Sequence, residues 1–86
     1  MDENEITDLI WKFALRNSVK FGGTPNPKAI MGKIMAERKD LRSQSNKVID
    51  IMGEIINQIK SMELEVQTKK LLEIDPSALD KNSVPT

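Results

Sequence analysis

The sequence has no cysteine and no histidine, and only three of its 86 residues are aromatic. The absence of cysteine excludes disulfides, thiolate metal sites and cysteine nucleophiles together. The absence of histidine removes the commonest metal ligand and the commonest general base. With so few aromatic residues, the core must be aliphatic, and the five methionines serve as adaptable filler.

Long apolar runs and catalytic motifs are also missing. No stretch of about 20 apolar residues is present, so we expect no membrane span. The acidic start, MDENEITDL, does not have the features of a signal peptide, and the default expectation is a cytoplasmic protein. The four glycines form neither a dinucleotide-binding nor a phosphate-binding loop, and the acidic residues do not have calcium-loop spacing. We therefore expect no catalytic, cofactor-binding or metal-binding residues in these 86 positions.

A first helix is predicted from about Glu3 to Phe21, and it is apolar on two sides. The main apolar face consists of Ile6, Leu9, Ile10, Phe13, Ala14 and Phe21. Nearly opposite stand Trp11 and Leu15, with Val19 beside them. Such a helix is either central in its bundle, which is the commoner arrangement, or keeps a patch for a partner. In the second case, Trp11, Leu15 and Val19 are candidate protein-docking anchors.

Gly22 and Gly23 end this helix, because glycine accepts the left-handed conformation that closes a helix C-terminus. Asn26 is a good N-cap, and Pro27 fits the first position of a second helix, predicted to run to about Arg38. Asn17 falls in the main apolar face of the first helix. We expect its amide to find hydrogen-bond partners in the backbone of this turn.

A third helix, capped by Ser43 or Ser45, is predicted to run to about Lys60 with one apolar arc, and a shorter fourth from about Met62 to Leu72. The fold class is therefore all-α, a small bundle of three main helices plus a short fourth. We expect one domain over residues 1–80 and a disordered tail or linker over residues 81–86. The predicted core consists of Leu9, Ile10, Phe13, Ile30, Ile34, Val48, Met52, Ile55 and Ile59.

Basic residues concentrate in the middle of a chain whose net charge is zero. Residues 28–49 contain six basic and two acidic side chains, a local charge of +4. The six are Lys28, Lys33, Arg38, Lys39, Arg42 and Lys47. Two readings are open: a solvated helix end matched to the helix dipole, or a weak, sequence-independent contact with the phosphates of a nucleic acid.

The stretch LIWKFALRNSVKFGGTPNPKAIMGKIMAERKDLR resembles the N-terminal helical extension of archaeal-type glutamyl-tRNA synthetases. The similar segments are Lys12–Asn17, the turn Gly23–Pro27, the apolar helix around Gly32, and the corner Lys39–Arg42. The IDPSALD segment near the C-terminus also fits. Thr24 and Pro25 depart from the basic and small residues common at that turn in the family. The signatures of the family's catalytic domain are absent.

The resemblance implies an appended, non-catalytic domain of a larger glutamate–tRNA ligase. It implies tRNA, the catalytic domain of the same chain and other aminoacylation or amidation components as partners, and no membrane. ATP and Mg²⁺ are implied for the parent enzyme, with no cofactor in these residues. The alternatives are a stand-alone helical interaction module and a tail-like tRNA-binding domain of a tRNA-dependent amidotransferase.

Overall fold

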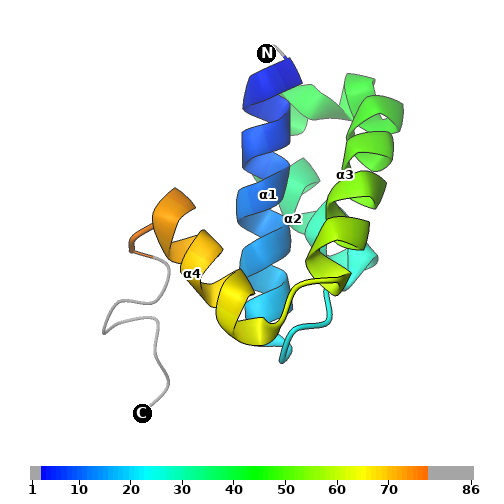
Figure 1. The fold of residues 1–86 in the computed structure, drawn as a ribbon. Helices are drawn as coiled ribbons and strands as arrows, with labels where there is room; N and C mark the ends of the chain where they lie inside the picture. The colour runs from blue at the N-terminus through cyan, green and yellow to red at the C-terminus, as the bar shows by residue number, and fades with distance from the viewer. Residues whose placement is uncertain (1–2, 78–86) are drawn as a thin grey trace.

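The computed structural model describes residues 3–77, and the expected boundary at residue 80 and the expected tail over residues 81–86 lie outside that range. Four α-helices and one 3₁₀-helix follow one another within it (Figure 1). Their bounds are α1 Glu3–Lys20, α2 Pro27–Glu37, η1 Lys39–Gln44, α3 Ser45–Lys60 and α4 Leu64–Ile74. No strand occurs among the described residues, and the all-α prediction is confirmed.

Helix α1 is the central element of the bundle. Helices α2 and α3 pack on one side of it, and α4 lies on the other side (Figure 1). The reading of a helix that is apolar on two sides because it is central is therefore correct. Of the nine predicted core residues, eight are buried, and Leu9 is partly buried and packed against them.

Phe21, expected on the main apolar face of the first helix, and Ile49, which helical spacing places on the apolar side of α3, are exposed instead. Phe21 is 57% exposed, because α1 ends at Lys20 and the chain turns away before Phe21 can reach the core. Ile49, which shares the apolar arc of α3, is 47% exposed. Helical periodicity predicts which face of a helix a residue lies on. How much of that face is buried depends on the helices that pack against it.

The turn between α1 and α2 forms as the glycines predict. Gly22 and Gly23 have φ values of +78° and +105°. The Gly22 N–H donates to the Val19 carbonyl and the Gly23 N–H to the Ser18 carbonyl, at 3.2 and 2.7 Å. This pair of bonds is the Schellman motif, which needs a left-handed residue after the helix.

Asn26 caps α2 as predicted, since its Oδ1 accepts hydrogen bonds from the N–H groups of Lys28 and Ala29. Asn17 of α1 supports the cap, because its Oδ1 accepts from the Asn26 N–H at 2.7 Å. The expected serine cap of α3 is wrong. Helix α3 continues directly from η1, and Gln44, which precedes it, makes no side-chain capping bond.

None of the helices described combines the length and the apolar character that a membrane crossing requires.

Candidate functional site

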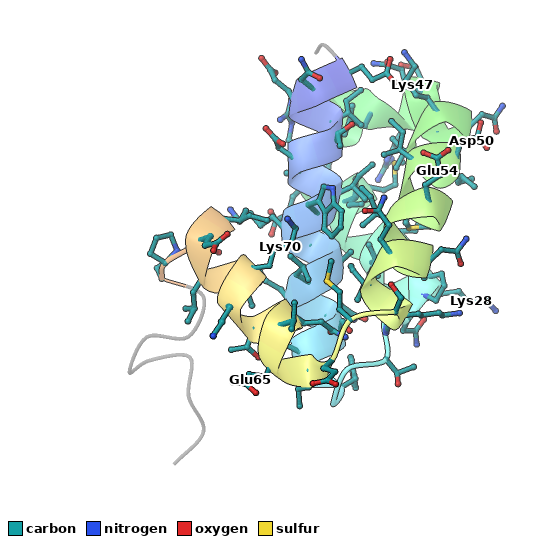
Figure 2. All side chains as sticks on the ribbon, viewed as in Figure 1. Lys28, Lys47, Asp50, Glu54, Glu65 and Lys70 are labelled. Carbon is teal, nitrogen blue, oxygen red and sulfur yellow. The ribbon has the colours of Figure 1, made fainter. Side chains whose placement is uncertain are left out.

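Five of the six basic residues of segment 28–49 are distributed over three elements, and Arg38 lies between two of them. Lys28 and Lys33 lie on α2, Lys39 and Arg42 on η1, and Lys47 on the first turn of α3. Figure 2 shows Lys28 and Lys47 at opposite ends of the bundle. The six therefore do not gather into one surface, because α2 runs from one end of the molecule to the other before the chain turns at η1.

Arg38, the C-cap of α2, is engaged with Asp40. The guanidinium donates from Nε to Oδ1 at 3.1 Å and from Nη2 to Oδ2 at 3.0 Å. These hydrogen bonds lower the pKa of Asp40 below its usual value and raise the pKa of Arg38. The carboxylate offsets the positive charge of the guanidinium and occupies two of its five N–H donors, so its attraction for a phosphate is weakened.

Lys47 stands in acidic surroundings. It shares a shallow surface depression with Glu3, Asp50 and Glu54, and Figure 2 shows Asp50 and Glu54 following it along α3. Nearby carboxylates weaken the attraction of this ammonium for an anion. Of the cations at the η1 corner, Lys39 and Arg42 are exposed, and no ion pair among residues 3–77 involves either of them.

The three proposed docking anchors of α1 have different environments. Leu15 is fully buried, so its expected exposure is wrong, because the side of α1 that carries Leu15 is covered by α4. Trp11 and Val19 are partly buried and pack against the core. The partner that covers this side of α1 is therefore a helix of the same chain.

An open groove of about 700 Å³ runs along α1 between Arg38 and the C-terminal part of α4. Leu9, Trp11 and Ile74 give it an apolar lining. Lys70 of α4 reaches toward α1 (Figure 2), and its Nζ lies 4.9 Å from the centre of the Trp11 ring. This distance is within the range of a cation–π contact. The lining also includes Glu5, Asp8 and Lys12, so the groove has charges of both signs.

Two features of the surface were not predicted from the sequence. The first is the contact between Lys70 and Trp11, which joins residues 59 positions apart and has no local signal. The second is a row of cations on α1, Lys12, Arg16 and Lys20, whose four-residue spacing was visible in the sequence. No group of three or more acidic side chains within residues 3–77 is arranged to hold a metal ion.

Comparisons with known proteins give one consistent result. The chain is 43% identical over 76 residues to the glutamate–tRNA ligase of Methanococcus maripaludis strain C7. It is 35% identical over 77 residues to that of Pyrococcus abyssi and 39% identical over 77 residues to that of Sulfurisphaera tokodaii. These alignments cover 88–90% of the chain but only 14% of the length of each relative. No protein-family model matches the chain, and no solved structure matches it significantly.

Proposed function

Because this chain belongs to the same sequence family as a segment of archaeal glutamate–tRNA ligases, we propose that it is a non-catalytic helical domain that assists tRNA binding during the glutamylation of tRNA. The observation that carries the proposal is the identity of 35–43% over nearly the whole chain. The matched segment is only 14% of the length of each relative, and the proposal places the chemistry in the parts that this chain does not match.

We assign no ATP or Mg²⁺ site to the described residues. They offer no group of three acidic side chains for a metal ion, and the glycines of the chain form no phosphate-binding loop. ATP and Mg²⁺ therefore enter the proposal only for the catalytic part of a larger ligase. In the proposal, these residues contribute cationic side chains that hold the phosphate backbone of tRNA without reading its bases.

Lys39 and Arg42 are the members of the six that are best suited to this contact. Both are exposed on η1, whereas Arg38 is held by Asp40 and Lys47 stands among carboxylates. Binding of a phosphate to each cation releases a condensed counterion, so affinity falls with salt. Each contact adds about 0.7–0.9 to the log–log slope of affinity against salt concentration.

The test is tRNA binding by the 86-residue chain across a salt series. Changing Lys39→Ala together with Arg42→Ala should flatten the slope by about 1.4–1.8. Adding Arg38→Ala to this pair should change the slope little further, because Arg38 is already paired. A matched control changes two other exposed lysines, Lys60→Ala and Lys69→Ala, and should keep the slope of the unchanged chain. Equal slopes for all four proteins would leave the η1 corner as a solvated helix end.

A second candidate function is docking onto another part of a larger protein, and α4 favours it. Helix α4 makes its extensive contacts with α1 alone. It exposes Leu64, Val66, Leu72 and Ile74 by 37–49%. These side chains are distributed around α4, and together they offer apolar area for contact with another protein. The same binding experiment separates the two candidates, because a docking domain has no measurable affinity for tRNA at any salt concentration.

A further inference from the structure

The solvent-facing side of α1 carries a row of three cations, Lys12, Arg16 and Lys20, which we name the α1 ridge. Residues four apart lie on the same side of an α-helix, with a rise of about 6 Å between them. Arg16 and Lys20 are exposed, and Lys12 is partly exposed at the edge of the groove beside Trp11. The ridge is therefore a straight line of positive charge about 12 Å long.

Asp8 stands four residues before Lys12 and lines the same groove, but the charges of Arg16 and Lys20 have no such neighbour. No ion pair within the described part of the chain involves Lys12, Arg16 or Lys20. The positions three and four residues away from Arg16 are Lys12, Phe13, Val19 and Lys20, none of which is acidic. Like charges one turn apart destabilise a helix. The helix dipole accounts for Lys20 in the last turn of α1, but its effect does not extend to Lys12. Neither pairing along α1 nor the helix dipole therefore accounts for Arg16, the middle cation of the row.

Aromatic side chains stand at both ends of the ridge. Phe21 follows Lys20 directly, is 57% exposed, and has the Lys20 Nζ 6.0 Å from its ring centre. Trp11 precedes Lys12 and lies beneath the ammonium of Lys70. Cations in line with accessible aromatic rings are the arrangement with which proteins bind single-stranded nucleic acid, because the cations contact phosphates and the rings stack on bases.

The acidic residues of α1 give the ridge a direction. Glu5 and Asp8 line the groove on the N-terminal side of Lys12. C-terminal to Asp8, α1 contains no further acidic residue before it ends at Lys20. A polyanion placed on this side of the helix is therefore repelled at the N-terminal end and attracted from Lys12 to Phe21.

We propose that the α1 ridge and Phe21 bind a single-stranded segment of RNA, with its phosphates on Lys12, Arg16 and Lys20 and an unpaired base stacked on the Phe21 ring. The inference rests on the proposed function, since it assigns the RNA-binding surface of a chain proposed to bind tRNA. It moves the main contact from the η1 corner to α1. Unpaired bases are the parts of an RNA that aromatic side chains can reach.

The test uses a fluorescently labelled ten-nucleotide oligouridine and unfractionated tRNA, each titrated with the 86-residue chain across a salt series. The ridge variant combines Lys12→Gln, Arg16→Gln and Lys20→Gln, because glutamine keeps part of the aliphatic stem and the helix propensity. Its log–log salt slope for oligouridine should fall by about 2. The Lys60→Ala, Lys69→Ala pair, two exposed lysines outside both proposed contacts, is the control and should keep the slope for this probe. Fluorescence of Trp11, the only tryptophan, should change on binding to the unchanged chain.

Phe21→Ala should weaken binding of oligouridine about fivefold or more, while Phe21→Tyr, which keeps a stacking ring, should retain the affinity. If the ridge variant binds both probes like the unchanged chain, the inference is overturned. The same holds if polyglutamate, tested as an acidic protein surface, competes with oligouridine on an equal charge basis. Circular dichroism checks the fold of each variant. If the triple variant does not fold, the single change Arg16→Gln replaces it in the test, with an expected decrease in the salt slope of about 0.7.

The two proposals fail in distinguishable ways. Binding of tRNA that is weakened only by the η1 pair overturns the ridge and keeps the proposed function. Binding of oligouridine through the ridge without binding of tRNA supports the ridge and removes the proposed function.

Discussion

Ile55 and Ile49 lie on the same helix and have the same side chain, but Ile55 is 2% exposed and Ile49 is 47% exposed. Ile55 belongs to the core that α3 forms with α1, while Ile49 lies at the margin of the same apolar arc. A buried side chain contributes its transfer free energy and its packing contacts, whereas an exposed one contributes little of either. The pair therefore separates the effect of burial from that of residue type.

Ile55→Ala should lower the free energy of unfolding by about 2–5 kcal/mol, because it removes buried methylenes and leaves a cavity. Ile49→Ala should lower it by less than about 1 kcal/mol, since its side chain already meets water. Chemical denaturation followed by circular dichroism measures both. A comparable loss in the two variants would mean that α3 does not bury the face that carries Ile55.

At the scale of the elements, the buried amide of Gln67 determines where α4 sits. Its Oε1 accepts a hydrogen bond from the Ser18 hydroxyl of α1. Its Nε2 donates to the carbonyls of Gly23, Ile59 and Met62 at 3.0–3.2 Å. One side chain thus joins α4 to α1, to the turn after α1 and to the end of α3. Buried polar groups need such partners, so a different placement of α4 would leave several of them unsatisfied.

Gln67→Leu should lower the free energy of unfolding by about 2–3 kcal/mol, because it keeps the volume but removes the donor or acceptor that the Ser18 hydroxyl and the Gly23 and Met62 carbonyls bond to. Since α4 makes its extensive contacts with α1 alone, the amides of α4 should lose hydrogen-exchange protection before those of α3. Thr68→Ala is the neighbouring control: its hydroxyl bonds within α4, to the Leu64 carbonyl, and its loss should cost less than about 0.5 kcal/mol. Uniform loss of protection in every helix would contradict a separate opening of α4.

At the scale of the whole molecule, the absence of histidine and cysteine removes the side chains that usually titrate near neutral pH. The free energy of unfolding should therefore be nearly constant from about pH 5 to pH 8. Hydrogen bonds from Arg38 hold the pKa of Asp40 below its usual value. A lowered folded-state pKa contributes stability above the unfolded pKa of about 3.9 and loses it as the pH falls through the lowered value.

Asp40→Asn should therefore remove a small part of the loss of stability below about pH 4 and leave the neutral plateau flat. The effect is small because the two side chains of the pair are 37% and 55% exposed. Urea denaturation midpoints over a pH series at low salt measure it. A steep change in stability between pH 5.5 and pH 8 would show that an ionisable group with a strongly shifted pKa has been overlooked.

The helices, the turn at Gly22 and Gly23, the cap at Asn26 and most of the core follow from the sequence alone. Their causes are local: helical periodicity, the left-handed conformation that glycine accepts, and an amide oxygen placed two and three residues before the N–H groups that it caps. Family membership also follows from the sequence, because it depends on residue identities along the chain.

Only the tertiary structure decides the surfaces. Leu15 is buried because α4 folds back onto α1, and the residue pattern of neither helix predicts that contact. Lys28 and Lys47 belong to one basic segment, but α2 separates them by the length of the bundle. Lys70 reaches Trp11 across 59 residues of chain. The spacing of residues along one helix determines which side chains share a face. Which faces then pack together depends on contacts between segments far apart in the chain, and the spacing within one helix does not predict those contacts.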